Sequence, residues 1–399
     1  MKDATKAVIA GRAPHDNHGV VNPPVYHAST ILSQTYAEMQ AKGRVDPADA
    51  TTYGVHGTPG TFALEKAVAT LEGGFRTRLC PTGLAAITGP LLSYLSAGDH
   101  LLMVDNCYGP TRRFCDRMLS RLGVETTYYD PLAGQNGAPG VETLIRPNTR
   151  VVFTESPGSL TFEMQDIPAI AEAAHRAGAI VMLDNTWASP LYFKPFEHGV
   201  DVSIQAATKY INGHSDLVMG TVTTTEAAYP ALRDGWLELG LAAGPDDVYL
   251  AMRGLRTIEV RLARHWENGL KVAEWLKTRP EVVEVIHPAL PDDPGHALWK
   301  RDFLGASSLF GFVLDDAFRS DAALAAVLDG LELFGMGASW GGFESLLVPR
   351  NPKPIRTASP WPRPGRPDGQ LMRIHVGLED PDDLIADLGA GFDRMRATA

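Results

Sequence analysis

The sequence is short of cysteine and of long apolar runs. Its 399 residues include only three cysteines, Cys80, Cys107 and Cys115. They form no CxxC pair, so neither a disulfide framework nor a zinc site is indicated, and we expect no metal and a reducing, cytoplasmic compartment. No run of 18 apolar residues occurs, and the first ten residues lack an apolar export segment, which argues against a membrane partner and against secretion.

Basic charge is scarce as well. The 36 lysines and arginines are outnumbered by 47 acidic residues, which leaves a net charge of −11. Such a chain offers no electrostatic surface to a polyanion, so nucleic acid is excluded as a main partner and a small molecule is expected. Only ten of the basic residues are lysines. Each lysine in an apolar setting therefore stands out.

What is present after residue 60 is an alternation of short apolar stretches and helical ones. The helical patterns cover residues 84–96, 110–122 and 168–177, and the predicted strands are 100–105, 126–130, 150–155, 179–184, 201–205 and 218–223. The stretch Ala-Ile-Val-Met-Leu at 179–183 is apolar at every position, as in strands that helices cover on both faces. We predict an α/β fold with a mostly parallel central sheet.

The flanks of this region differ from it. Residues 22–53 are rich in proline, glycine and threonine and are predicted to be extended, ahead of a helix at 61–72. One long helical pattern covers residues 245–278 and is followed by strand–helix pieces, which indicate a smaller α+β domain. The seven prolines of residues 349–369 predict a loop.

The predicted domain boundaries follow from these patterns. We expect an N-terminal arm over residues 1–60 that contacts a neighbouring subunit, a large cofactor-binding domain over 61–255 and a small C-terminal domain over 256–399.

Two polar residues follow apolar strands. Asp184 ends the strand that begins at 179, and Lys209 follows the strand 201–205 after Ala-Ala-Thr. In doubly wound sheets, ligands bind beyond the carboxyl ends of the strands. A buried carboxylate and a lysine among small apolar residues are costly unless they are paired or used. On spacing alone, a structural aspartate with an ordinary solvated lysine fits equally well.

A third segment favours a bound ligand. Pro81-Thr82-Gly83-Leu84 places the free N–H groups of a helix start after a probable strand, which suits a phosphate, although an N-cap with a tight turn is the commoner use. A lysine, a carboxylate and a phosphate seat together match pyridoxal phosphate, which needs a group for its aldehyde, its ring nitrogen and its phosphate. Tyr108 is available to stack on the ring.

Longer motifs resemble a known family. The runs Asp184-Asn-Thr-Trp-Ala-Ser-Pro and Asp201-Val-Ser-Ile-Gln-Ala-Ala-Thr-Lys209-Tyr-Ile-Asn-Gly-His-Ser-Asp216 resemble the Cys/Met-metabolism family of pyridoxal-phosphate-dependent enzymes, in particular its β-lyase branch. The likeness covers nearly the whole chain. It implies an aspartate-aminotransferase-like fold (fold type I) and a homotetramer, a dimer of dimers with shared active sites.

The resemblance also implies roles for single residues. Lys209 would bind the cofactor's aldehyde and act as the catalytic base, and Asp184 would pair with the ring nitrogen. Tyr108 would stack on the ring, and Tyr53 would act in the site of a neighbouring subunit, so that both are candidate catalytic tyrosines. The implied phosphate ligands are Gly83, Leu84 and Thr208.

The implied substrate is an amino acid. A bidentate guanidinium is suited to an α-carboxylate, and Arg373 occupies the family position for this role, with Ser339 and Trp340 in the substrate wall. The implied reaction is the α,β-elimination of L-cystathionine to L-homocysteine, pyruvate and ammonia in methionine biosynthesis, with cleavage of cysteine or other S-substituted cysteines. The alternatives within the family are a cystathionine γ-synthase or γ-lyase reaction and a cysteine desulfhydrase.

The chain departs from the family pattern at three sites. Val55 stands where many members carry an arginine that reaches the phosphate, Ala206 where a serine is common, and Trp236 and Leu237 where the best-known β-lyases have a tyrosine. With Val55 and Ala206, the chain has fewer side chains that can contact the cofactor's phosphate than many members of the family. A cofactor-binding regulator or an inactive scaffold is therefore the alternative outside the enzyme class.

Overall fold

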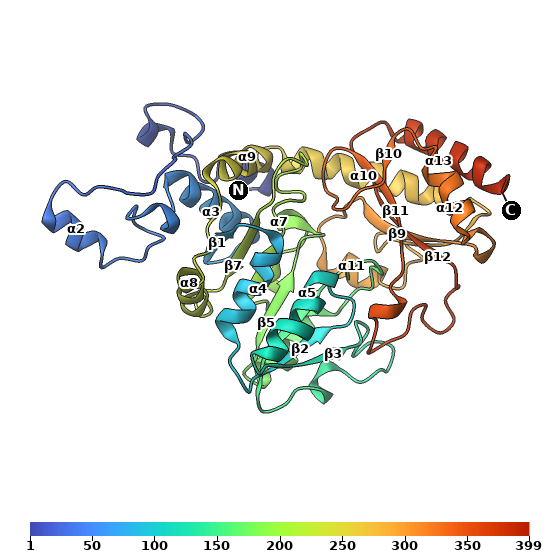
Figure 1. Cartoon of the computed structure of the whole chain (residues 1–399), viewed down its shortest axis with the longest axis horizontal. Coiled ribbons are helices and arrows are strands. Elements are labelled where there is room, and N and C mark those ends of the chain that lie inside the picture. Colours follow the sequence, from blue (N-terminus) through green and yellow to red (C-terminus); the bar gives the residue numbers. More distant parts are fainter. Residues whose placement is uncertain (399) are drawn as a thin grey trace.

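Two β-sheets organise the chain in a computed structural model that describes residues 1–398 (Figure 1). The larger sheet has the strand order β1-β7-β6-β5-β4-β2-β3. Its strands are β1 Arg76–Cys80, β2 His100–Val104, β3 Glu125–Tyr129, β4 Thr149–Glu155, β5 Ile180–Asp184, β6 Val202–Gln205 and β7 Gly220–Thr224. Only β7 runs antiparallel to its neighbours. The predicted α/β class with a mostly parallel sheet is confirmed.

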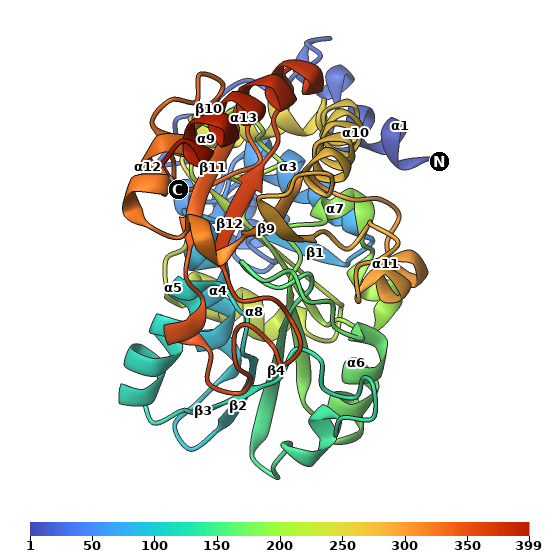
Figure 2. The ribbon, with the colours of Figure 1, turned by 90° about the vertical axis from the view of Figure 1, so that its right-hand side faces the viewer.

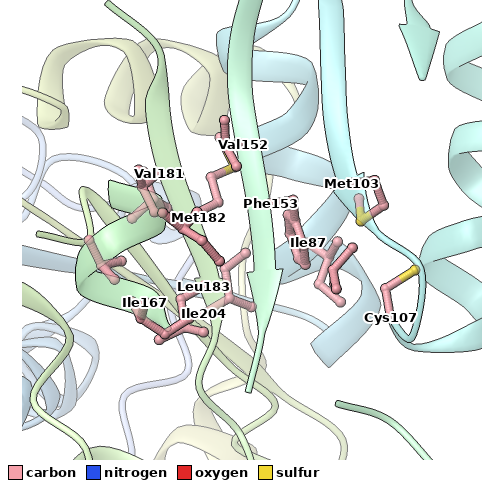
Figure 3. Packing of buried hydrophobic residues seen from close by; sticks show 14 of the residues in the cluster. Ile87, Met103, Cys107, Val152, Phe153, Ile167, Val181, Met182, Leu183 and Ile204 are labelled. Carbon is pink, nitrogen blue, oxygen red and sulfur yellow. The ribbon is translucent and has the colours of Figure 1, made fainter. Parts of the chain in front are cut away.

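The central strands are buried on both faces because their side chains are apolar at successive positions. Val152 and Phe153 of β4 and Met182 and Leu183 of β5 are fully buried (Figure 3). Helices α4 and α5 lie on one side of this sheet and α6 on the other (Figure 2). The helices of this region are α3 Pro59–Glu72, α4 Gly83–Tyr94, α5 Gly109–Phe114, α6 Ile167–Arg176, α7 Ser189–Tyr192 and α8 Tyr229–Glu238.

The second sheet forms the C-terminal part, at the right of Figure 1. Its strand order is β10-β11-β12-β9-β8. The strands are β8 Val282–Ile286, β9 Leu309–Leu314, β10 Phe334–Gly335, β11 Ser345–Arg350 and β12 Gln370–His375, and the helices are α10 Ile258–Leu276, α11 His296–Asp302, α12 Asp321–Leu328 and α13 Pro381–Arg396. Side chains from α10, α12 and α13 share one apolar core with this sheet.

The sequence predicted that residues 22–53 are extended, but the structure shows that only part of this segment is. Helix α2, Tyr36–Lys42, interrupts them. The Thr35 hydroxyl caps this helix by accepting the Glu38 N–H at 3.1 Å, and Lys42 pairs with Glu38 one turn earlier. The segment with α2 extends away from the two sheets (Figure 1), and α1, Asp3–Ile9, precedes it.

The prediction of one helix over residues 245–278 was wrong. The chain forms α9, Pro245–Leu255, and a separate helix α10. The Gly254 carbonyl, which an uninterrupted helix would use for its own hydrogen bonding, accepts from the Arg261 guanidinium at 2.8 Å and from the Thr257 hydroxyl at 3.2 Å. These side-chain bonds stabilise the break between the helices.

The predicted proline loop begins later than expected, because Pro349 lies in β11 opposite Met372 of β12. The shorter strand β10 pairs only with Ser345 and Leu346, so this part of β11 is an edge where the missing N–H of a proline is tolerated. Residues 351–369 then connect β11 to β12. The division into arm, large domain and small domain stays a prediction.

The core makes a stability prediction. Phe153→Ala leaves a cavity between the sheet and its helices, so we expect it to lower the free energy of unfolding by about 3–5 kcal/mol. Phe75→Ala is the matched control, because this phenylalanine is 44% exposed, and should cost less than about 1 kcal/mol. Urea denaturation of both variants measures the difference, and equal losses would contradict this account of the core.

Candidate active site

A pocket opens at the carboxyl ends of β4, β5 and β6, next to β12 of the second sheet. It encloses about 280 Å³, and the residues predicted at the cofactor and substrate site line it, with Tyr53 as the exception. The lining residues taken from that prediction are Gly83, Leu84, Tyr108, Asp184, Thr208, Lys209, Ser339, Trp340 and Arg373. The pocket thus collects side chains from positions 83 to 373.

Asp184 ends β5 and turns into the pocket. Its carboxylate accepts the Thr186 hydroxyl at 2.5 Å and the Thr186 N–H at 3.1 Å. Burial raises the pKa of Asp184, and these hydrogen bonds offset part of the effect. The same Thr186 hydroxyl accepts the Ala206 N–H at 2.9 Å. Thr186, which the sequence analysis missed, therefore fixes the carboxylate to the loop that leads to Lys209.

Glu155 is a second half-buried carboxyl group on the pocket wall, and the sequence did not single it out. It ends β4 directly opposite Asp184 of β5. Its Oε2 accepts the backbone N–H of Tyr108 at 2.7 Å. Burial raises the pKa of Glu155 well above its usual range, and the charge of Asp184 adds to this. The sequence did contain a signal for this residue, because Glu155, like Asp184, is an acidic residue at the end of an apolar strand.

Lys209 reaches across the pocket to the second sheet. Its Nζ donates to the Ser339 hydroxyl at 2.5 Å, and the Ser339 carbonyl accepts from Arg373 Nη2 at 3.0 Å. Burial and the charge of Arg373 lower the pKa of Lys209 to about 8, although Asp184 acts in the opposite direction. A lysine with this pKa is partly neutral near pH 8 and can act as a base.

The serine between the two cations has an unusual backbone. Ser339 has a φ of 78°, in the left-handed region that few residues other than glycine adopt. Gly341 follows it with a φ of 84°, and a Cβ there would lie 3.0 Å from Cα of Lys209. The turn can approach the lysine this closely only because position 341 is a glycine.

Two aromatic side chains border the pocket. The Trp340 ring lies 5.2 Å from the Lys209 amine and packs against Tyr210. Tyr108 immediately precedes α5 and is 44% exposed on the pocket wall. Burial, with the charges of Asp184 and Glu155, raises the pKa of Tyr108. Its phenol is therefore protonated at neutral pH.

The start of α4 is the candidate anion seat. The Thr82 hydroxyl caps the helix at the Ala85 N–H, at 2.9 Å, and Gly83 and Leu84 follow in the first turn. A Cβ on Gly83 would lie 2.7 Å from that of Ala206, so only glycine fits here. The Thr208 hydroxyl is bonded to Met219, donating to its carbonyl at 3.1 Å, and would have to rotate to reach a phosphate.

Tyr53 does not enter this pocket. It lies in the arm, 48% exposed, and pairs with Thr30 in an isolated bridge. Trp236, at the position where a tyrosine was absent, is also outside the pocket, because its indole lies under the buried guanidinium of Arg78 at 3.7 Å and donates to the Leu79 carbonyl. Within a single chain, both positions therefore have structural contacts only.

The described residues fit pyridoxal phosphate. Asp184 is a half-buried carboxyl group on the pocket wall. It is bonded to Thr186 and forms no ion pair with a lysine or arginine in residues 1–398, which suits a protonated ring nitrogen. Lys209 lies on the same pocket with a lowered pKa. The helix start at Gly83 lines the same pocket and has no room for a side chain. The donor set thus matches the aldehyde, the ring nitrogen and the phosphate of this cofactor.

Fold and pocket together define an α/β enzyme of the pyridoxal-phosphate class. The chain belongs to the family described as Cys/Met metabolism PLP-dependent enzymes, which residues 4–393 match.

Relatives and solved structures of this family resemble the whole chain. A protein of Rhizobium johnstonii named putative cystathionine beta-lyase is 51% identical, over 97% of this chain and 95% of its own length. The cystathionine beta-lyase of Salmonella typhimurium is 44% identical over 98% of both chains. The cystathionine gamma synthase of Xanthomonas oryzae pv. oryzae, solved with aminoacrylate and cysteine, superposes with a TM-score of 0.88 at 32% identity and full coverage.

Two further sequence expectations can be compared with the structure. None of the helices in residues 1–398 is both long enough and apolar enough to span a bilayer. Cys80, Cys107 and Cys115 are buried free thiols. Burial raises the pKa of Cys107 well above its usual range, as expected for an unreactive thiol beside Tyr108.

The electrostatics of Lys209 make a prediction. Acylation of its amine in the cofactor-free protein should follow pH with a midpoint near 8, because only the neutral amine reacts. Arg373→Met removes a neighbouring positive charge and should move the midpoint upward. Arg319→Met is the control, since this arginine pairs with Asp316 on the surface. Mass spectrometry of the peptide with Lys209 measures both, and an unmoved midpoint in Arg373→Met contradicts the coupling.

Proposed function

We propose that the protein cleaves the Cβ–S bond of L-cystathionine by α,β-elimination and releases L-homocysteine, pyruvate and ammonia. The observation that carries the proposal is the hydrogen-bonded chain Lys209–Ser339–Arg373, which sets a partly neutral amine beside a guanidinium in one pocket. The likeness to two proteins named cystathionine beta-lyase supports this substrate over the other thioethers.

Arg373 is the proposed anchor of the substrate's α-carboxylate. Arg373 is half-buried and its bond to Ser339 uses one Nη2 donor, so other N–H groups remain for a bidentate contact. Burial and the charge of Arg350 lower its pKa to about 10, and it stays protonated at neutral pH. Anchoring at this point turns the substrate's Cα–H toward Lys209.

Lys209 is the proposed base. When bound, pyridoxal phosphate makes the Cα proton acidic by drawing electrons into its protonated ring. Asp184 keeps the ring nitrogen protonated, and the Lys209 amine takes the proton from Cα. The amine can do so near pH 8 because burial and Arg373 lower its pKa.

The leaving sulfur needs a proton in turn. The proposed donors are the Lys209 ammonium, the Tyr108 phenol on the pocket wall and Tyr53 of a neighbouring subunit. The Cβ–S bond breaks as the thiol forms, and the remaining aminoacrylate hydrolyses to pyruvate and ammonia. Trp340 lies over the lysine at 5.2 Å and limits how far water reaches the reacting atoms.

Assembly belongs to the same proposal. The arm carries several exposed apolar side chains, Val20, Val21, Leu32, Tyr36 and Met39, and such a surface favours contact with another copy. We place Tyr53 in the pocket of that copy, within a homotetramer. The buried free thiols suit a reducing compartment, and we propose that the enzyme works in the cytoplasm.

The product identifies the reaction. Purified holoenzyme with L-cystathionine should form pyruvate, whereas γ-elimination gives 2-oxobutyrate. Lys209→Ala should lower kcat by at least about 10²–10⁴-fold, because the base and the cofactor's anchor are lost. Lys66→Ala, at an exposed position of α3, should keep the wild-type rate. Chromatographic identification of the keto acid checks both, and 2-oxobutyrate as the main product overturns the proposal.

Sharing of sites predicts complementation. Tyr53→Ala and Lys209→Ala should each be nearly inactive alone. When the two variants are refolded together, mixed assemblies contain pockets with Lys209 from one chain and Tyr53 from another, and activity should return to a sizeable fraction of the wild-type value. If Tyr53 served its own chain, every pocket would lack one residue and the mixture would stay inactive.

A further inference from the structure

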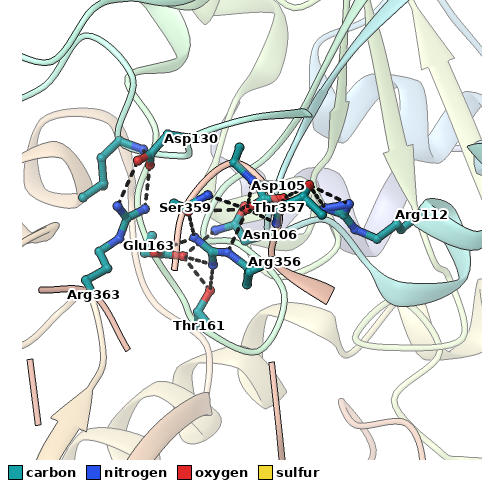
Figure 4. A network of polar contacts seen from close by, with 12 residues as sticks. Asp105, Asn106, Arg112, Asp130, Thr161, Glu163, Arg356, Thr357, Ser359 and Arg363 are labelled. Carbon is teal, nitrogen blue, oxygen red and sulfur yellow. Dashed lines mark hydrogen bonds and ion pairs between the residues drawn. The ribbon is translucent and has the colours of Figure 1, made fainter. Parts of the chain in front are cut away.

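The loop of residues 351–369 contacts the larger sheet through a buried network of charges (Figure 4). This loop connects β11 to β12, the strand with Arg373. Its Arg356 and Arg363 meet carboxylates from three segments of the cofactor region, Asp105, Asp130 and Glu163. The loop is therefore a bridge from the substrate-anchoring strand to the cofactor sheet.

Asp105, just beyond β2, is the most heavily bonded member. Its carboxylate accepts the backbone N–H groups of Thr357 at 3.0 Å, Ala358 at 3.0 Å and Ser359 at 3.1 Å. It also accepts from Arg112 and from Arg356 Nε. Burial raises the pKa of Asp105, but the bonds from Arg112 and Thr357 outweigh it and hold the pKa below the usual range. The carboxylate is thus charged and fully paired.

Arg356 uses its whole guanidinium. Nε donates to Asp105 at 3.1 Å, Nη1 to Thr161 at 3.1 Å and to Glu163 at 2.9 Å, and Nη2 to Glu163 at 3.1 Å and to Ser359. Five contacts match the five N–H donors of arginine. The side chain is 1% exposed. A lysine would supply the charge without this planar fork.

The charges balance around it. Arg363 donates to Glu163 at 2.6 Å and to Asp130 at 2.6 and 3.0 Å. With Arg112 and Arg356, three arginines meet three carboxylates. Removing one partner from such a buried set leaves an uncompensated charge, which is costly. The loop is therefore fixed in one place on the cofactor region.

The network borders two walls of the pocket. Asp105 precedes the pocket residue Tyr108 by three positions, and Thr161 and Glu163 flank the pocket residue Phe162. Asn106, which follows Asp105, joins the two walls: its side-chain amide donates to Glu163 at 3.0 Å, and its backbone carbonyl accepts the Ser159 N–H at 2.9 Å.

The second wall also has strained backbone. Leu160 and Phe162 both have positive φ values, 65° and 52°, and both line the pocket. Such conformations persist only where surrounding contacts hold them. The contacts at hand are those of Thr161 and Glu163 with Arg356.

We propose that Arg356 is a positioning residue for the reaction: by binding Asp105, Thr161 and Glu163 at once, it sets the two pocket walls with Tyr108 and Phe162 relative to the strand with Arg373. A substrate held at Arg373 must present its Cα–H to Lys209 and its thioether to these walls. A misplacement of about 1 Å far from the reacting atoms can cost about 100-fold in rate. Arg356 therefore acts on kcat through other residues and touches no substrate itself.

The inference rests on the proposed function only where turnover is measured. Arg356→Gln should lower kcat for L-cystathionine by about 10–100-fold while the cofactor stays bound, and Arg356→Lys should regain only part of it. Lys353→Gln is the matched control, because this lysine lies in the same loop and pairs with Asp368 within it, at the surface. The control should keep the wild-type kcat.

Hydrogen exchange of the holoenzyme tests the inference without substrate. In Arg356→Gln, residues 105–114 and 157–164 should lose protection in addition to the loop, whereas Lys353→Gln should change the loop alone. If only residues 351–369 respond, or if kcat stays within twofold of the control, the inference is overturned. Loss of exchange protection with a wild-type enzyme that forms no pyruvate would contradict the proposed function and leave the positioning role supported.

Folding is controlled separately. Because Arg356→Gln removes one of three arginines from a network with three carboxylates, the double variant Arg356→Gln/Glu163→Gln restores the charge balance. It is judged by the same exchange and rate criteria. Thermal unfolding by circular dichroism shows that each variant is folded at the assay temperature. A folded double variant with wild-type kcat and wild-type exchange at 105–114 also overturns the inference.

Discussion

The structure depends on bringing two cations, Lys209 and Arg373, into one pocket without a carboxylate between them. Ser339 makes this possible, because its hydroxyl accepts from the lysine and its carbonyl from the arginine. Burial of the amine, with the nearby charge of Arg373 as a second cause, lowers the pKa of Lys209 to about 8. The contact that helps to make the amine a usable base also places the proposed carboxylate anchor beside it.

That contact joins two separate sheets, so its geometry depends on how the sheets are held. Lys209 follows β6 of the larger sheet and Arg373 lies on β12 of the smaller one. The turn at Ser339 and Gly341 supplies the direct contact, and the 351–369 loop supplies a second one through Arg356 and its three partners. A left-handed serine is strained, and a buried charge network is costly to break. The strained Ser339 and the Arg356 network both lie at the boundary between the two sheets. Each sheet, by contrast, is held by apolar packing in its own core.

The local pattern of apolar and polar residues predicted most strands and two residues of the pocket, but it failed at three places. Unbroken apolar runs identified the buried strands, and polar residues at strand ends identified Asp184 and Lys209. Glu155 ends a strand in the same way, directly opposite Asp184, but the pairing of the two strand ends depends on the order of strands in the sheet. The break between α9 and α10 depends on Arg261, whose side chain folds back to a carbonyl seven residues earlier, and no local pattern contains that bond. The late start of the proline loop depends on β11 being an edge beyond β10.

The sequence by itself determined the fold class, the family and the residue types of the pocket. These depend on the spacing of apolar residues and on long motifs, and both can be recognised from positions that are close together in the chain. Only the tertiary structure decided that Lys209 shares a serine with Arg373 and that Thr208 bonds to Met219. It also decided that Arg356 uses five donors on partners up to 251 positions away. Such contacts arise from the packing of whole sheets and loops, and packing depends on residues that are far apart in the chain.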